Sequence, residues 1–167
     1  GRRRWAEKTP QNVLAIDWTL ERFPEARFIH VIRDGRDVVC SMREHPDRRW
    51  VDGAWVKVHR PLSLDRYARR WTSDTQEGIR HRDDPRYLEV RYEDLVRDPG
   101  AVLGRLLADL GEVFDPAILV DPDSGPGTDG AHHAGTAIST RSMGRWRKDL
   151  TPAELAVVEA IAGETLA

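Results

Sequence analysis

Apolar residues recur along the chain with two spacings, one typical of helices and one typical of strands. Four segments carry apolar positions at helical spacing, namely residues 13–23, 64–79, 102–110 and 155–161. Two short segments rich in β-branched and aromatic residues, 27–32 and 87–92, are predicted strands. This alternation of strands and helices predicts an α/β fold with a parallel sheet, in which ligands bind beyond the carboxyl ends of the strands.

Local signals mark where several of these helices begin and end. Thr9-Pro10 is a helix start, with proline at the first helical position, and Pro24 ends that helix. Thr151 and Glu154 have the spacing of a capping box that opens the last helix. Gly111 follows the third of these helices, in the position of a C-cap residue.

Two segments lack a clear period and are predicted as loops. Residues 45–61 are irregular and aromatic, and they are interpreted either as a loop that gates an acceptor or as packing under an Ω-like loop. Residues 115–135 are rich in Pro, Gly, Asp and Ser and include His132 and His133. Two adjacent histidines without nearby cysteines or spaced carboxylates make a poor metal site.

Composition and charge narrow the class of protein. A length of 167 residues favours a single domain over 1–167, and 40% hydrophobic with 32% charged residues is the balance of an ordinary folded protein. The net charge of −2 argues against a general nucleic-acid binder. A lone cysteine, Cys40, excludes an internal disulfide, fits a reducing compartment and predicts a cytoplasmic location. We interpret Cys40 as a core residue, because it lies in an apolar helical stretch. Tyr67 and Trp71 lie in the apolar stripe of another predicted helix and are interpreted as core residues as well.

The sequence shows no membrane span and no signal peptide. No apolar run approaches the roughly 20 residues that a membrane-spanning helix requires. The basic opening, residues 1–4, is not followed by the apolar core of a signal peptide, and the chain does not begin with methionine.

The turn after the first predicted strand is the strongest candidate for ligand chemistry. Arg33 and Arg36 lie in this turn, and the hydroxyl of Ser41 follows on the next helical segment. A buried strand that passes through a loop into a helix leaves backbone N–H groups free at the helix start, and arginine matches phosphate in shape. The alternative is a plain Arg–Asp ion pair at a strand end, with no function.

Two further basic positions could contribute to anion binding. Lys8 precedes the first predicted helix, where its ammonium could lie near a bound anion or simply in solvent. Residues 139–148 hold three arginines, a lysine and three hydroxyls. This segment could wrap an anion as a mobile loop, although a solvated run of charge is the default interpretation.

Taken together, the motifs resemble those of the sulfotransferase family. Four segments occur in the family's order: Glu7-Lys8-Thr9-Pro10, Arg33-Asp34-Gly35-Arg36-Asp37 with Ser41, Tyr92-Glu93-Asp94-Leu95, and Gly144-Arg145-Trp146. The resemblance extends from Trp5 to about Leu155 and is greatest to the bacterial branch similar to tyrosylprotein sulfotransferases.

The resemblance implies a P-loop-NTPase-like parallel sheet flanked by helices and the donor 3′-phosphoadenosine 5′-phosphosulfate (PAPS), with no metal. It implies donor-binding roles for five residues: Arg33, Arg36, Ser41, Tyr92 and Arg145. Among these, Arg33 and Ser41 would bind the 3′-phosphate, and Tyr92 would lie near the nucleotide. Lys8 matches a catalytic lysine that steadies charge on the transferring sulfuryl group. The acceptor would be the hydroxyl of a small molecule, carbohydrate, lipid or peptide.

One family segment has no counterpart in these residues. The family begins with a strand and a loop of the type Arg-Ser-Gly-Thr-Thr around the 5′-phosphosulfate, so we expect an N-terminally incomplete fold whose catalytic base lies upstream. Such a sheet would expose an unpaired edge and favour self-association. The alternative function is a non-catalytic nucleotide-binding or interaction module. A kinase of the P-loop class would need a Gly-x-x-x-x-Gly-Lys loop and magnesium ligands, which the sequence lacks.

Overall fold

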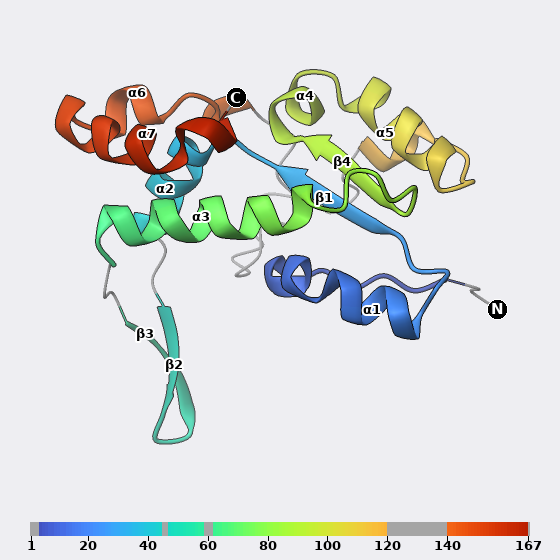
Figure 1. Ribbon diagram of the computed structural model, residues 1–167, viewed down its shortest axis with the longest axis horizontal. Coiled ribbons are helices and arrows are strands. Elements are labelled where there is room, and N and C mark those ends of the chain that lie inside the picture. Colours follow the sequence, from blue (N-terminus) through green and yellow to red (C-terminus); the bar gives the residue numbers. More distant parts are fainter. Residues whose placement is uncertain (1–3, 45–46, 59–61, 120–139, 167) are drawn as a thin grey trace.

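Two parallel strands form the centre of the protein, and helices surround them (Figure 1). The structure is a computed structural model that describes residues 4–44, 47–58, 62–119 and 140–166. The helices are α1 (Ile16–Arg22), α2 (Gly35–Glu44), α3 (Leu64–Ile79), α4 (Tyr92–Arg97), α5 (Pro99–Asp109), α6 (Trp146–Asp149) and α7 (Pro152–Leu166). Short 3-10 helices are η1 (Pro10–Ala15), η2 (Pro116–Leu119) and η3 (Thr140–Ser142), and the strands are β1 (Phe28–Ile32), β2 (Asp47–Val51), β3 (Ala54–Val58) and β4 (Tyr87–Arg91).

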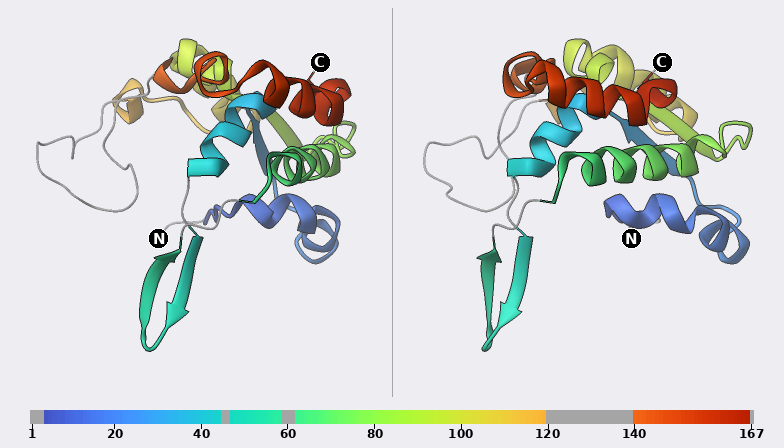
Figure 2. Two further views of the ribbon diagram at one scale, coloured as in Figure 1. Left: turned by 90° about the vertical axis from the view of Figure 1, so that its left-hand side faces the viewer. Right: turned by 60° about the vertical axis from the view of Figure 1, so that its left-hand side comes forward.

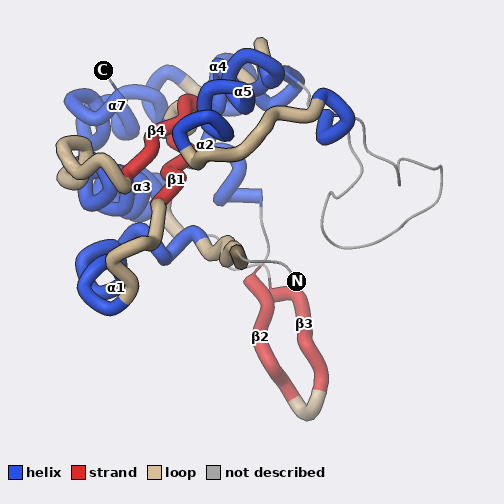
Figure 3. Tube along the Cα trace, turned by 90° about the vertical axis from the view of Figure 1, so that its right-hand side faces the viewer, coloured by secondary structure: helices blue, strands red, loops and turns tan. Residues whose placement is uncertain are grey.

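The parallel pairing of β1 with β4 confirms the predicted α/β fold. Phe28 pairs with Tyr87 at one end of the ladder, and Ile32 pairs with Arg91 at the other. The next residues along each chain therefore leave the sheet at the same edge. Figure 3 shows α3 and α7 on one side of these strands and α4 and α5 on the other.

The core forms where α2, α3 and α7 meet. Val39, Tyr67, Ala68 and Val158 make one buried cluster, which confirms that the aromatic stripe of α3 is core. A second cluster joins Ile16 and Leu20 of α1 to Tyr87 of β4. Cys40 is fully buried, and burial raises the pKa of its thiol to about 11, as expected for a packing residue.

The predicted first helix is divided in the structure. Residues 10–15 form the tight η1 helix, and only residues 16–22 form α1. Thr9 gives no side-chain cap, because its hydroxyl donates to the Glu7 carboxylate instead. Pro10 occupies the first helical position as predicted, and α1 ends at Arg22, with Phe23 as its C-cap directly before the turn at Pro24.

The loop predicted over 45–61 is wrong for most of its length. Residues 47–58 form an antiparallel hairpin, β2–β3, that projects from the body of the protein (Figure 2). Asp52 and Gly53 form its turn with positive φ angles of 48° and 84°. Asp-Gly is the preferred pair for such a tight hairpin turn, and it was the signal that the irregular, charged flanks obscured.

Strand β1 is less buried than its apolar sequence suggested. Ile32 is buried, whereas Ile29 and Val31 are 44% and 47% exposed. Alternate residues of a strand point to opposite faces, so the described helices cover one face of β1 more completely than the other. The expected buried strand is therefore half-buried.

The C-terminal capping signals are confirmed. The Thr151 backbone N–H and hydroxyl both donate to Glu154, and the Glu154 N–H donates back to the Thr151 hydroxyl. Gly111 follows α5 with a φ of 70°, as a C-cap requires. The predicted loop over 115–135 begins with η2, and its remainder, including His132 and His133, lies outside the described residues.

Gly35, the first residue of α2, packs directly on Trp71 of α3. A Cβ at this position would lie 2.5–2.7 Å from ring atoms of Trp71, which is buried. We predict that Gly35→Ala lowers the free energy of unfolding by about 1–3 kcal/mol through overpacking, measured by urea denaturation. Gly104→Ala, in a part of α5 with nothing within 4 Å, is the control and should raise stability by up to about 1 kcal/mol. Equal effects of the two substitutions would contradict the packing argument.

Candidate functional site

Arg33 lies at the edge where β1 and β4 both end. Its guanidinium packs over the ring of Tyr92, the first residue of α4, at 4.9 Å from the ring centroid. Its side chain is 18% exposed, and it donates one hydrogen bond to the Ser142 carbonyl. Among the described residues its buried Nε has no hydrogen-bond partner. Arg33 thus presents a half-buried positive charge with donor capacity to spare.

Arg36 is instead held by carboxylates. Asp34 accepts hydrogen bonds from the Arg36 backbone N–H and from two guanidinium nitrogens, at 2.8–3.0 Å. Arg36 also pairs with Glu159 at 3.1 Å and stacks on Trp146. Burial would raise the pKa of Asp34, but the hydrogen bonds from Arg36 outweigh it and hold that pKa below its ordinary value.

The same contacts correct one part of the sequence argument. The turn was expected to leave backbone N–H groups free for an anion, yet the Asp34 carboxylate accepts the N–H of Arg36. The Asp34 N–H in turn donates to the Glu93 carboxylate at 2.9 Å. Fewer backbone N–H groups are therefore free at this turn than the sequence led us to expect.

Asp37 is a buried carboxylate that holds the C-terminal segment on α2. Its side chain is 1% exposed and accepts hydrogen bonds from the N–H groups of Gly144, at 2.6 Å, and Trp146, at 3.0 Å. Arg33 lies 4.0 Å away. Two backbone donors and a nearby cation satisfy the charge that burial would otherwise penalise.

Ser41 lies on the face of α2 that Asp37 and Glu44 also share, because residues four and seven apart align along a helix. Glu44 accepts a hydrogen bond from Arg145 at 2.6 Å, and Asp149 accepts another at 2.6 Å. Those hydrogen bonds raise the pKa of Arg145 above its ordinary value. The segment of residues 144–149 therefore lies along the face of α2 that carries Ser41.

The basic segment, for which a solvated run of charge was the default interpretation and an anion-wrapping loop the alternative, packs against α2 where the structure describes it. Residues 142–149 are tied to α2 through Asp37 and Glu44, and Arg43 adds a hydrogen bond to the Asp149 carbonyl at 2.7 Å. Gly144 has a φ of 66°. The carboxylates of Asp37 and Glu44 on α2 account for this packing.

Arg33, Arg36 and Tyr92 lie near the start of α2, whereas Ser41 and Arg145 lie toward its end, and Lys8 is not linked to any of them. Arg33 and Tyr92 are in contact, and Arg145 bonds Glu44, the last residue of the helix that carries Ser41. Within the described ranges, no hydrogen bond or ion pair joins Lys8, which is exposed, to any of these residues. Its neighbour Glu7 bonds Thr9 and Asn12, and those hydrogen bonds lower the pKa of Glu7.

The residues that position the site were mostly missed from the sequence. The recognised motifs contain or adjoin Asp37, Glu44 and Glu93. Sequence spacing alone, however, does not distinguish a carboxylate that binds an arginine or a backbone N–H group from a carboxylate that is exposed to solvent. For Glu93 the position directly after β4 was a usable signal, because β1 ends at the same edge.

Comparison with known proteins decides the family. The sequence model of the sulfotransferase family matches residues 1–116. The chain belongs to the sulfotransferase family. It is 32% identical over 116 residues to the omega-hydroxy-beta-dihydromenaquinone-9 sulfotransferase of Mycobacterium bovis, covering 62% of this chain and 28% of that protein. It is 28% identical over 158 residues to mouse (Mus musculus) carbohydrate sulfotransferase 5, covering 84% of this chain and 40% of that protein.

Solved structures agree with this assignment and show the P-loop-like α/β fold. The sulfotransferase domain of the Synechococcus PCC 7002 olefin synthase aligns with a TM-score of 0.62 at 25% identity, over 94% of this chain and 56% of that one. The sulfotransferase domain of the curacin biosynthetic pathway aligns with a TM-score of 0.63 at 21% identity, over 95% of this chain and 61% of that one.

The sulfotransferase chain spans less than half the length of the curated relatives it matches. Over the described residues, no helix is both long enough and apolar enough to cross a membrane.

The Asp37 contacts generate a stability prediction. In Asp37→Asn, the amide nitrogen must face one of two backbone N–H donors, so one hydrogen bond is lost and its donor is left buried. We expect the free energy of unfolding to fall by about 2–3 kcal/mol in urea denaturation. Asp109→Asn, an exposed aspartate at the end of α5, is the matched control and should change stability by less than about 0.5 kcal/mol. A comparable small effect at Asp37 would refute its anchoring role.

Proposed function

We propose that this protein is a sulfotransferase that moves a sulfuryl group from PAPS to a hydroxyl acceptor. Membership of the sulfotransferase family supports the reaction class. The observation that carries the donor assignment is the position of Arg33, half-buried against Tyr92 at the shared carboxyl edge of β1 and β4. Ligands of α/β sheets bind at that edge.

In this proposal Arg33 and Ser41 bind the 3′-phosphate of the donor. Arg33 retains donor capacity on a side chain that is already ordered by Tyr92 and the Ser142 carbonyl. Little side-chain freedom would be lost when it binds an anion, which favours affinity. The half-buried Ser41 adds a neutral hydroxyl from the next helix, and Tyr92 lies where the nucleotide would pack.

Arg145 and Arg36 are assigned smaller roles. Arg145 is already paired with Glu44 and Asp149, so it would have to exchange a carboxylate for the donor. Arg36 is paired with Asp34 and Glu159, and we assign it a positioning role at the start of α2. Lys8 is proposed to stabilise charge on the transferring group, as the family resemblance implies.

The chemistry needs positioning and charge stabilisation more than covalent steps by the protein. Sulfuryl transfer resembles phosphoryl transfer, with a loose transition state and in-line attack by the acceptor oxygen. PAPS supplies an activated sulfuryl group whose leaving oxygen belongs to the nucleotide. Cationic side chains such as Lys8 are suited to neutralise the charge that develops there.

The acceptor is proposed to be a hydroxyl on a lipid-like, carbohydrate, peptide or other small molecule. The relatives are named for a hydroxylated dihydromenaquinone and for carbohydrate.

Two further features bear on association and location. The exposed Ile29 and Val31 on β1 favour self-association of the isolated chain. The lone buried thiol of Cys40 favours a cytoplasmic location.

Substitution of Arg33 tests the donor site. Each charge-assisted hydrogen bond to phosphate contributes about 1.5–3 kcal/mol, so Arg33→Ala should weaken binding of adenosine 3′,5′-bisphosphate at least about tenfold. Isothermal titration calorimetry measures this affinity directly. Arg97→Ala is the control, because Arg97 is 60% exposed on α4 and pairs with Asp94 at 3.4 Å. Equal affinity of Arg33→Ala and Arg97→Ala would remove Arg33 from the site.

The alternative function is a nucleotide-binding or interaction module without catalysis. Turnover of radiolabelled PAPS with a panel of hydroxyl acceptors separates the two functions. The proposal expects labelled product that decreases in Lys8→Ala while bisphosphate affinity is retained. Binding without turnover at high enzyme concentration would favour the module.

A further inference from the structure

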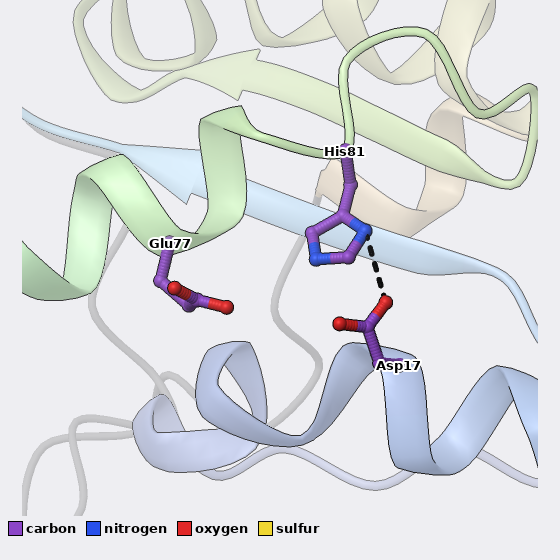
Figure 4. Close-up of side chains that lie close together, drawn as sticks. All are labelled: Asp17, Glu77 and His81. Carbon is purple, nitrogen blue, oxygen red and sulfur yellow. Dashed lines mark ion pairs between the residues drawn. The ribbon is translucent and has the colours of Figure 1, made fainter.

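One imidazole and two carboxylates converge where α1 meets the end of α3 (Figure 4). Asp17 lies in the first turn of α1, Glu77 in the last turn of α3, and His81 just after that helix. One ligand-capable atom from each residue lies within 4.8 Å of the others. The proposed sulfuryl transfer uses none of the three.

His81 is largely buried, and neither of its ring nitrogens makes a hydrogen bond within the described residues. Its side chain is 12% exposed, and its ring lies 6.4 Å from the ring of the buried Tyr87. Nδ1 faces Asp17 Oδ1 at 3.7 Å, which is too long for a hydrogen bond. Across the described parts of the chain, the buried Nε2 has no hydrogen-bond partner. An ordered imidazole with unused nitrogens, set between carboxylates, has the chemistry of a metal ligand.

The two carboxylates can adjust to an ion. Asp17 is 79% exposed, so its side chain is free to change rotamer. Glu77 pairs with the exposed Arg80 through one oxygen at 2.9 Å. A carboxylate can hold an arginine with one oxygen and a metal with the other.

The spacing and the donor set select the kind of ion. Two ligands on a tetrahedral zinc ion, each at about 2.0–2.1 Å, lie about 3.4 Å apart. The 3.7 Å between His81 and Asp17 is close to that value. Imidazole favours zinc and similar transition metals over magnesium or calcium, which prefer oxygen ligands alone.

We propose that Asp17, Glu77 and His81 form a structural zinc site, with water completing the coordination. The ion would connect α1 to the end of α3 through its three protein ligands. Helix α1 has seven residues, a length that is marginal without tertiary support. Because the site is assembled only in the folded chain, zinc binding stabilises the fold.

Thermal unfolding of the tag-free chain with and without Zn²⁺ tests the site. The wild-type chain should unfold at a higher temperature with zinc, and Asp17→Asn and His81→Gln should lose that increase. Removal of a ligand should weaken zinc affinity at least about tenfold, as loss of even an outer-shell partner does. Asp17 is highly exposed, so Asp17→Asn leaves folding intact.

Two controls and a second readout make the result specific. Glu21→Gln removes another exposed acid of α1, and the double variant His132→Ala, His133→Ala removes the adjacent histidine pair; both should respond to zinc like wild type. Co²⁺ should give a visible absorption band that Asp17→Asn loses. No zinc response in the wild-type chain, or a response kept by Asp17→Asn but lost by the His132, His133 variant, overturns the proposal.

Discussion

The buried carboxylate of Asp37 is the constraint on which the arrangement around α2 depends. A charge removed from water needs hydrogen-bond donors, and the chain provides them from two backbone N–H groups more than a hundred residues away in sequence. Meeting that requirement places Gly144, Arg145 and Trp146 along α2. The contacts of Arg36 with Trp146 and of Arg145 with Glu44 follow from this placement.

The arginines around this helix fall into two groups, those paired with carboxylates and Arg33, and we assign the first group a structural role and Arg33 a role in donor binding. Arg36, Arg43 and Arg145 are each paired with carboxylates from α2, α6, α7 or the adjoining turn. Arg33 instead contacts an aromatic ring and a carbonyl, with Asp37 at a longer 4.0 Å. The paired arginines hold the segments around α2 together, and Arg33 is the one that we propose binds the donor.

The sequence predicted those features that depend on local pattern. Helix α3 was expected over 64–79 and runs Leu64–Ile79, because its apolar spacing and its burial agree. The sequence placed Arg33 at the end of one predicted strand and Tyr92 at the end of the next, and the parallel pairing of β1 with β4 brings both to one edge, but their contact was not predicted. The sulfotransferase family itself was recognised from motifs in the right order.

What the sequence could not provide was the long-range pairing of polar groups. Nothing local indicates that Asp37 is buried while Asp109 is exposed, because the difference arises from a segment folded back from residue 144 onward. The β2–β3 hairpin was missed for another reason: its Asp52-Gly53 turn was read within a charged, aromatic stretch without clear alternation. The division between η1 and α1 was likewise invisible in the apolar spacing.

The central claim is that the turn between β1 and α2 recognises a 3′-phosphate. Calorimetric titration of the wild-type chain with adenosine 3′,5′-bisphosphate, and separately with adenosine 5′-monophosphate, isolates that one group. The account predicts markedly tighter binding of the bisphosphate, because only its 3′-phosphate can engage Arg33 and Ser41. Equal affinity for the two nucleotides, or no binding of either, would contradict it.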